Sequence, residues 1–129
     1  MKSKARAVVI GGGVVGVSTL YHLAAKGWDD SILLERKSLT SGSTWHAAGL
    51  LPLFNMSYSV GQIHKYSVRF YQELQDETGM DVGFRKVSNI RLASTQDRMD
   101  EYLQYKGVAD TIGVEVNVLS PQEIKDCWP

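Results

Sequence analysis

Hydrophobic positions near the N-terminus fall in two short runs separated by a helical pattern. Ala7–Ile10 is apolar at all four positions, which is typical of a strand buried on both faces of a parallel sheet. A glycine-rich turn follows, and residues 14–26 then carry apolar side chains in the helical period, with Gly27 as the expected stop. Residues 32–34 form a second apolar run. The pattern therefore predicts a strand–helix–strand unit at the start of the chain.

Farther along, the pattern changes from a loop to a long helix. Residues 39–53 are rich in Ser, Thr, Gly and Ala, which predicts a long loop with room for one helical turn. Loops of this length inside a compact domain are usually functional. A helix is predicted over residues 58–78, with Gly79 as its end, and a hairpin or short strands over residues 83–93.

Two helix start signals mark the last third of the chain. Thr95 is the predicted N-cap of a helix that continues to residue 112, with Gly113 as its end. Residues 114–119 then alternate as a strand does. The run 120–123 combines an N-cap serine, a proline at the first helical position and a glutamate at the third. A further helix is predicted to begin there. The sequence ends soon after this signal, so we expect that the chain is truncated.

The glycine-rich turn has the spacing GxGxxG. Gly11, Gly13 and Gly16 follow a predicted buried strand and open a predicted helix, which is the context that a dinucleotide-binding turn requires. The first glycine permits the tight turn, the second lets a pyrophosphate approach the backbone, and the third lets helix and strand pack closely. The backbone amides of Val14 and Val15 are then expected to point at the phosphates, assisted by the helix dipole.

Glu35 ends the second predicted strand, nineteen residues beyond Gly16. A carboxylate at this place accepts hydrogen bonds from a ribose diol and repels a 2′-phosphate. The nucleotide is therefore expected to be FAD or NAD rather than NADP. The alternative, a glycine-rich turn followed by a surface glutamate, is disfavoured by the flanking strand and helix.

The next segment distinguishes FAD from NAD. Glu35-Arg36, followed by Ser-Gly-Ser-Thr-Trp-His-Ala-Ala-Gly-Leu over residues 41–50, resembles the glycine oxidase and D-amino-acid oxidase family of flavoproteins. It is most similar to the branch of dimethylglycine dehydrogenase, sarcosine dehydrogenase and dimethylglycine oxidase. The resemblance implies that this loop runs along the flavin and that His46 is bonded covalently to the flavin 8α-methyl group.

The composition of this loop suits contact with a flat ring. Its small residues let backbone approach closely, the hydroxyls of Ser43 and Thr44 can bind phosphate oxygens, and the imidazole of His46 is a nucleophile. Trp45 can stack near the ring or serve as a packing residue. The residues expected to contact FAD are Gly11, Gly13, Val14, Val15, Gly16, Glu35, Arg36, Gly42, Ser43, Thr44, Trp45, His46, Ala47, Ala48, Gly49 and Leu50.

The resemblance also implies a fold and an activity. We expect an α/β fold with the N-terminal part of a Rossmann-type FAD-binding domain over residues 1–82 and the beginning of a sheet-containing substrate domain over residues 83–129. The implied activity is oxidative N-demethylation of a small N-methylated amino acid. Oxygen or an electron-transferring flavoprotein would accept the electrons, and tetrahydrofolate would bind through C-terminal domains. The catalytic base is not identified.

Two other functional classes remain open. One is another FAD-dependent amine or amino-acid oxidase of the same fold, and the other is a non-catalytic nucleotide-binding fragment. His22 lies on a polar stripe and receives no role. His64 could border the cofactor cavity, although a structural role is favoured for it.

Charge and cysteine content narrow the partners and the compartment. Lys plus Arg and Asp plus Glu both total 14, so no basic excess favours nucleic acid or an anionic membrane surface. No apolar run approaches the roughly 20 residues that span a bilayer, and no signal peptide is expected before the first strand. Cys127 is the only cysteine, which excludes an internal disulfide, and no residue spacing indicates a metal site. A cytoplasmic location is expected.

Overall fold

The computed structural model describes residues 4–129, and the chain divides into two compact units, Met1–Leu50 and Leu51–Pro129. Residues 1–3, which belong to the segment where no signal peptide is expected, lie outside the described residues.

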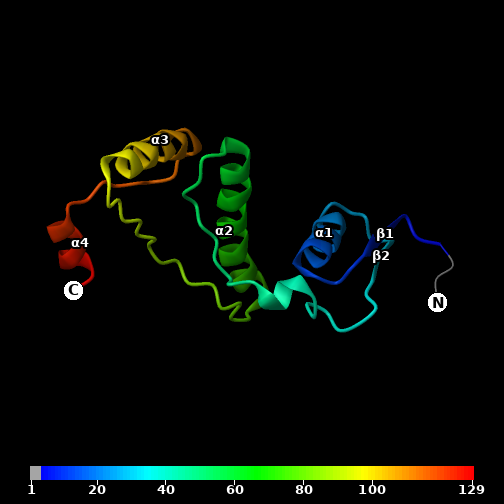
Figure 1. The fold of residues 1–129 in the computed structure, drawn as a ribbon. Helices are drawn as coiled ribbons and strands as arrows, with labels where there is room; N and C mark the ends of the chain where they lie inside the picture. Colours follow the sequence, from blue (N-terminus) through cyan, green and yellow to red (C-terminus); the bar gives the residue numbers. More distant parts are fainter. Residues whose placement is uncertain (1–3) are drawn as a thin grey trace. The chain divides into compact units, whose positions relative to one another are not determined.

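The first unit is a strand–helix–strand motif, as the sequence predicts. Strand β1 (Ala7–Ile10) and strand β2 (Ser31–Leu34) pair in parallel, with Ala7 opposite Ser31. Helix α1 (Val14–Ala25) connects them and contacts both strands (Figure 1). Gly27 follows α1 with φ +78°, a left-handed conformation that glycine adopts without steric cost.

The strands are less buried than the sequence pattern predicts. Val8 is 52% exposed and Ile10 is 85% exposed, although apolar strands of this kind are normally covered on both faces. The physical reason is the small size of the layer: the sheet of the described residues has two strands, and α1 is the helix of this unit that contacts them. The prediction of burial on both faces is therefore wrong for this unit.

The second unit is helical. Thr95 and Ser120 cap two of its helices as predicted, and Ser57, which was not predicted, caps the third. The side chain of Ser57 accepts a hydrogen bond from the Val60 amide, and that of Thr95 accepts one from the Arg98 amide. A full capping box joins Ser120 and Glu123, since each side chain accepts a hydrogen bond from the other residue's amide. The helices are α2 (Tyr58–Thr78), α3 (Gln96–Ile112) and α4 (Pro121–Cys127).

Helices α2 and α3 meet at a glycine. Gly61 on α2 is buried, and a β-carbon there would lie within van der Waals overlap of the Ile112 side chain. Lys65 Nζ donates a hydrogen bond of 2.7 Å to the Ile112 carbonyl, which satisfies an acceptor in the last turn of α3. Ala109 and Ile112 are the buried apolar residues of the described chain. The core of this unit is therefore small.

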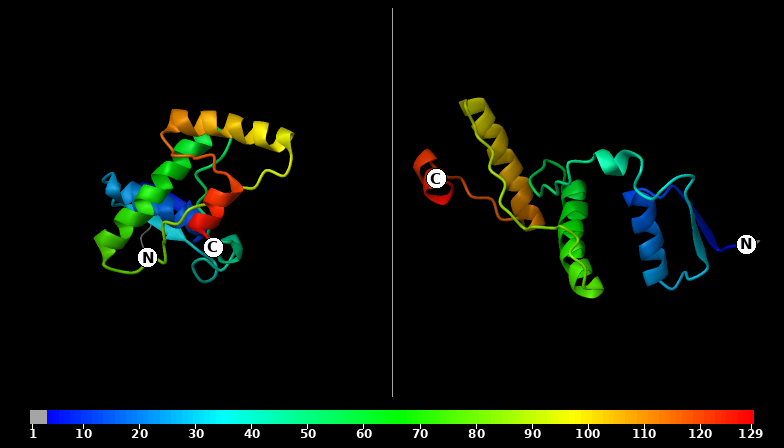
Figure 2. Two further views of the ribbon diagram at one scale, coloured as in Figure 1. Left: turned by 90° about the vertical axis from the view of Figure 1, so that its left-hand side faces the viewer. Right: turned by 90° about the horizontal axis from the view of Figure 1, so that it is seen from below.

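Two segments that were predicted as strands are not strands. Residues 83–93 and 114–119 lie in stretches without helix or strand; the first leads from α2 to α3 (Figure 2). A strand needs a neighbouring strand to bond its backbone, and the one sheet of the described residues consists of β1 and β2. Alternation of side chains alone therefore did not produce strands here.

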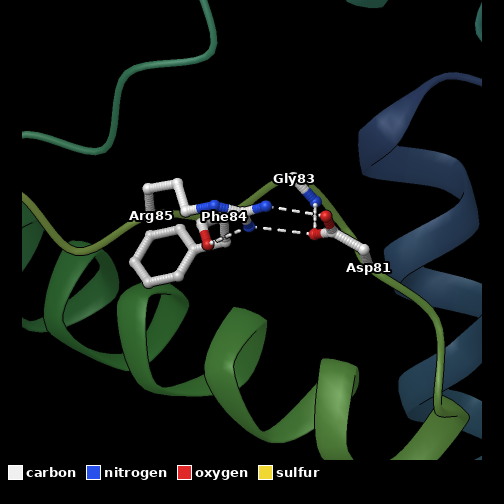
Figure 3. A network of polar contacts seen from close by, with 4 residues as sticks. All are labelled: Asp81, Gly83, Phe84 and Arg85. Atoms are coloured by element: carbon white, nitrogen blue, oxygen red, sulfur yellow. Dashed lines mark hydrogen bonds and ion pairs between the residues drawn. The ribbon is translucent and has the colours of Figure 1, made fainter.

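The stretch after α2 begins with a local network of hydrogen bonds around Asp81 (Figure 3). The Asp81 carboxylate accepts two hydrogen bonds from the Arg85 guanidinium, of 2.9 and 2.7 Å, and one of 2.8 Å from the Gly83 amide. The guanidinium, followed by the amide, holds the pKa of Asp81 far below its usual range, and Asp81 in turn raises the pKa of Arg85. Because both side chains are largely exposed, solvent screens this pair and it stabilises the fold little.

Candidate cofactor site

The glycine loop between β1 and α1 is shaped by two glycines that cannot be replaced without conflict. Gly11 has φ +107°, and its amide donates a hydrogen bond of 2.8 Å to the Leu34 carbonyl, which extends the contact of the two strands. A β-carbon on Gly16 would overlap the carbonyl oxygen of Gly11. The first turn of α1 therefore lies directly on the loop backbone, as a dinucleotide-binding turn requires.

Glu35 is bonded to the middle of this loop. Its Oε2 accepts a hydrogen bond of 2.7 Å from the Gly12 amide, and its Oε1 accepts one of 2.7 Å from the Lys37 amide. The Gly12 amide, followed by that of Lys37, lowers the pKa of Glu35, and Arg36 adds to this effect through its amide and charge. The carboxylate is thus held in its ionised form at the edge of the glycine loop.

An ionised carboxylate in this position retains capacity for a ribose. A carboxylate offers about four acceptor sites, and the amides of Gly12 and Lys37 use two of them. The remaining lone pairs can accept hydrogen bonds from a 2′,3′-diol, and the negative charge disfavours a phosphate in the same place. The geometry therefore fits the role expected for Glu35.

The lowered pKa of Glu35 predicts a pH dependence of stability. The folded pKa lies below the ordinary value of 4.5, so the stabilisation by the ionised carboxylate is present above that value and is lost as the pH falls through the folded pKa. Urea unfolding of the cofactor-free protein should show a difference between wild type and Glu35→Gln that is constant at neutral pH and shrinks in acid. A difference that stays constant down to pH values below the folded pKa would contradict the assignment.

The start of α1 already bonds an oxygen atom. The Val14 amide donates a hydrogen bond of 2.9 Å to Thr44 Oγ1, although the sequence predicts that the amides of Val14 and Val15 face phosphates. Gly13 leaves room for this hydroxyl, because a β-carbon there would lie 3.0 Å from Thr44 Oγ1. An acceptor oxygen thus sits where the helix N-terminus favours negative charge. The residues present therefore fit a pyrophosphate at this place.

The loop after β2 contains the predicted helical turn, a 3₁₀ turn over Ser43–His46 that we call η1. His46 Nδ1 lies 3.1 Å from the Gly42 carbonyl oxygen, which can only accept, so Nδ1 carries the proton. In the neutral ring, Nε2 then keeps its lone pair. Trp45 is 74% exposed, and its ring meets that of His46 edge to face, at an interplanar angle of 72° with 6.2 Å between centroids.

The glycine loop and η1 are joined through Thr40, a residue that the sequence analysis did not single out. The Thr40 amide donates a hydrogen bond of 2.9 Å to the Gly12 carbonyl, and the Trp45 amide donates one of 3.2 Å to the Thr40 carbonyl. Thr40 has φ +63°. Gly12 was also missed, because it occupies a variable position of the GxGxxG spacing. Neither contact has a signal in the sequence.

The other predicted contact residues lie in the same unit with exposed side chains. Val15 and Leu50 are each 77% exposed, and Gly49 has φ +71°. The structure thus places all sixteen predicted residues between β1 and the end of the first unit, and it bonds the glycine loop to Glu35 and Thr44. Eleven of the sixteen are exposed, namely Val14, Val15, Arg36, Gly42, Ser43, Trp45, His46, Ala47, Ala48, Gly49 and Leu50.

The remaining histidines have local bonds. His64 Nδ1 lies 2.5 Å from the Pro52 carbonyl oxygen, within the second unit, which fits a structural role. His22 Nδ1 donates to the Ser18 carbonyl at 2.7 Å, and this residue borders a surface hollow of about 360 Å³ that residues of α1 and Lys26 line and that no predicted cofactor residue lines.

Among the described residues, no cluster of potential metal ligands occurs, and no helix has the length and apolar character to cross a membrane.

The chain is similar in sequence to known oxidoreductases. The model of a family described as FAD dependent oxidoreductase matches residues 6–129. Dimethylglycine dehydrogenase of Rattus norvegicus, named as mitochondrial, is 43% identical over 128 residues, which cover 99% of this chain and 15% of the relative. Mitochondrial sarcosine dehydrogenase of Homo sapiens is 42% identical over 130 residues, which cover 100% of this chain and 14% of the relative. The chain thus spans a small part of each relative's length.

A solved structure shows the same fold. L-proline dehydrogenase from P. horikoshii superposes with a TM-score of 0.87 at 24% identity, over 98% of this chain and 33% of that one. Together with the parallel strands and α1, this likeness confirms the expected α/β class with a Rossmann-type FAD-binding domain.

Proposed function

This chain belongs to the family of FAD dependent oxidoreductases, and from that premise we propose that it serves the flavin-dependent oxidation of a small N-methylated amino acid. The observation that carries the proposal is the joining of the glycine loop, Glu35 and Thr44 in one unit, with His46 on the same turn as Thr44. Relatives named as dimethylglycine and sarcosine dehydrogenases support the class of substrate.

Each part of the site would hold one part of FAD. The start of α1 and the hydroxyl of Thr44 would bind the pyrophosphate, and Glu35 would accept hydrogen bonds from the adenosine ribose. When bound, the flavin supplies a two-electron acceptor for a hydride equivalent from the N-methyl carbon, and the iminium left behind is hydrolysed to formaldehyde and the demethylated amine. The protein's own contribution is binding and orientation.

His46 would hold the flavin covalently. Its Nδ1–H donates a hydrogen bond to the Gly42 carbonyl, so Nε2, with its lone pair, is the atom available for a bond to the 8α carbon. Attachment would replace a C–H bond by a C–N bond, so that one proton would leave the methyl group and one the imidazole. The two electrons released would pass to dioxygen or another two-electron acceptor. This balance requires no further protein group.

Other expectations remain predictions. The domain boundary near residue 82, the cytoplasmic location, the physiological electron acceptor and a folate partner all belong to this group. The division of the chain into two compact units falls between Leu50 and Leu51. It follows from contacts within this chain, and the domain boundary near residue 82 stays a prediction.

The proposed activity can be tested with the intact, purified protein. Anaerobic addition of sarcosine or dimethylglycine should bleach the flavin's visible absorbance, and hydrolysis of the iminium should release one formaldehyde per flavin reduced. An artificial acceptor should then restore the absorbance. Glycine is the matched control, because it lacks the N-methyl group and should neither bleach the flavin nor yield formaldehyde.

Three outcomes distinguish the rival classes. Bleaching by glycine or proline without formaldehyde would favour another amine or amino-acid oxidase of this fold. A protein that binds no flavin would favour a non-catalytic nucleotide-binding module. Formaldehyde from N-methylated substrates alone would support the proposal.

A further inference from the structure

Thr40 has an unusual backbone conformation for its residue type. Its φ of +63° lies in the left-handed region, and it is the one non-glycine residue with positive φ in the described part of the chain. A β-branched side chain makes this region costly, since the β-carbon and its branches crowd the neighbouring carbonyl. Such a conformation persists only where the surrounding structure holds it in place, and it is concentrated at functional sites.

The surrounding bonds that hold Thr40 are both backbone bonds. Its amide donates to the Gly12 carbonyl at 2.9 Å, and its carbonyl accepts from the Trp45 amide at 3.2 Å. The first bond reaches the glycine loop and the second reaches η1. The bend at Thr40 therefore turns one peptide group toward the loop for the pyrophosphate and the other toward the turn that carries His46.

The glycine loop and the segment that leads to Thr40 are closely packed. A β-carbon on Gly12 would lie 2.6 Å from Leu39 Cδ2 and 3.1 Å from Glu35 Cβ, so the glycine loop packs directly against the chain that leads to Thr40. Val14 and Thr44 form a second bond between the same segments. Two hydrogen bonds, from Thr40 to Gly12 and from Val14 to Thr44, therefore join the glycine loop to the segment that carries His46.

We propose that Thr40 is a positioning residue whose left-handed backbone fixes η1, and with it His46, against the glycine loop before the flavin is attached. The inference rests on the proposed attachment at His46. Preorganisation matters because the reacting nitrogen must be held close to its target carbon, and a displacement of about 1 Å can slow such a reaction on the order of 100-fold. The Thr40 side chain has no part in this role; the backbone has all of it.

Three substitutions of Thr40 separate backbone from side chain. Thr40→Pro removes the amide and fixes φ near −65°, so it breaks both bonds. Thr40→Gly accepts positive φ without strain and keeps both bonds. Thr40→Val keeps the branched shape and loses only the hydroxyl. Apoprotein of each variant would be mixed with FAD, and the flavin retained after acid precipitation would be followed with time, together with the FAD dissociation constant.

We expect attachment in Thr40→Pro to be at least tenfold slower, with a much smaller change in the dissociation constant for FAD. Thr40→Gly and Thr40→Val should attach flavin within about twofold of the wild-type rate. Attachment at the wild-type rate in Thr40→Pro would overturn the proposal, and so would equal slowing in Thr40→Val, which would assign the effect to the hydroxyl.

Amide hydrogen exchange of the wild-type apoprotein provides a test that needs neither variant nor attachment. The amides of Thr40 and Trp45 should be protected before FAD is added, because both donate hydrogen bonds to carbonyl groups of the chain itself. Exchange of both amides at unprotected rates would overturn the proposal even if Thr40→Pro fails to fold. Wild-type protein with protected amides but freely dissociable flavin would instead refute covalent attachment while leaving the preorganised turn in place.

Discussion

Gly16→Ala is expected to abolish FAD binding by the intact protein. A β-carbon at this position overlaps the carbonyl oxygen of Gly11, a backbone atom that cannot rotate away as a side chain can. Either α1 moves off the loop or the loop deforms, and both changes misplace the amides at the start of α1 that would face the pyrophosphate. The expected destabilisation of the first unit is about 1–3 kcal/mol, in addition to the loss of the cofactor.

Gly107→Ala is the matched control for this substitution. Gly107 lies within α3, and a β-carbon there would meet no atom within 4 Å. Alanine should stabilise the helix by roughly 0.5–1 kcal/mol relative to glycine. Flavin absorbance after gel filtration and a thermal melt would be measured for both variants. Normal FAD content in Gly16→Ala would contradict the close packing of α1 on the loop.

His46→Ala should release all flavin when the protein is denatured in acid. In the wild type, acid precipitation followed by proteolysis should yield a flavin-bearing peptide that contains Trp45 and His46. The expectation follows from the Nε2 lone pair of His46, which the bond from Nδ1 to the Gly42 carbonyl leaves available on the turn that also carries Thr44. Mass spectrometry of the peptide identifies the modified residue.

His22→Ala serves as the control for this experiment. His22 belongs to the first unit, but its Nδ1 bonds the Ser18 carbonyl within α1 and it lies outside the glycine loop and η1. Covalent flavin should survive its replacement. Complete loss of flavin from denatured wild type would refute attachment, whereas loss from both variants would point to a disturbed fold instead of a lost nucleophile.

Local sequence signals predicted the helices closely because helix ends depend on neighbouring residues. Thr95 and Ser120 cap α3 and α4 through bonds to amides three residues away, and Gly79 and Gly113 end α2 and α3 with positive φ. The two apolar runs and the helical pattern between them likewise predicted the strand–helix–strand unit. These features need no information from distant parts of the chain.

Features that depend on distant contacts were not predictable. Residues 83–93 alternate as a strand does, but a strand requires a partner that the pattern does not reveal. The bond from Val14 to Thr44 joins residues thirty positions apart, and the left-handed bend at Thr40 arises from its bonds to Gly12 and Trp45. These features depend on contacts between distant residues, so the types of the neighbouring residues do not predict them.

The self-contained caps of the helices have a consequence for how the nascent chain folds. Helices α2 and α3 contain 21 and 17 residues, more than the roughly 12–15 at which an isolated helix becomes marginally stable, so each can begin to form as it leaves the ribosome. Strand β1 must wait, because its partner follows only after α1 has been synthesised. The bend at Thr40 needs both the glycine loop and η1, and it therefore closes later than either. The residues of the glycine loop, Thr40 and η1 are all synthesised before those of α2 and α3, so the turn that carries His46 can be fixed before the second unit is complete.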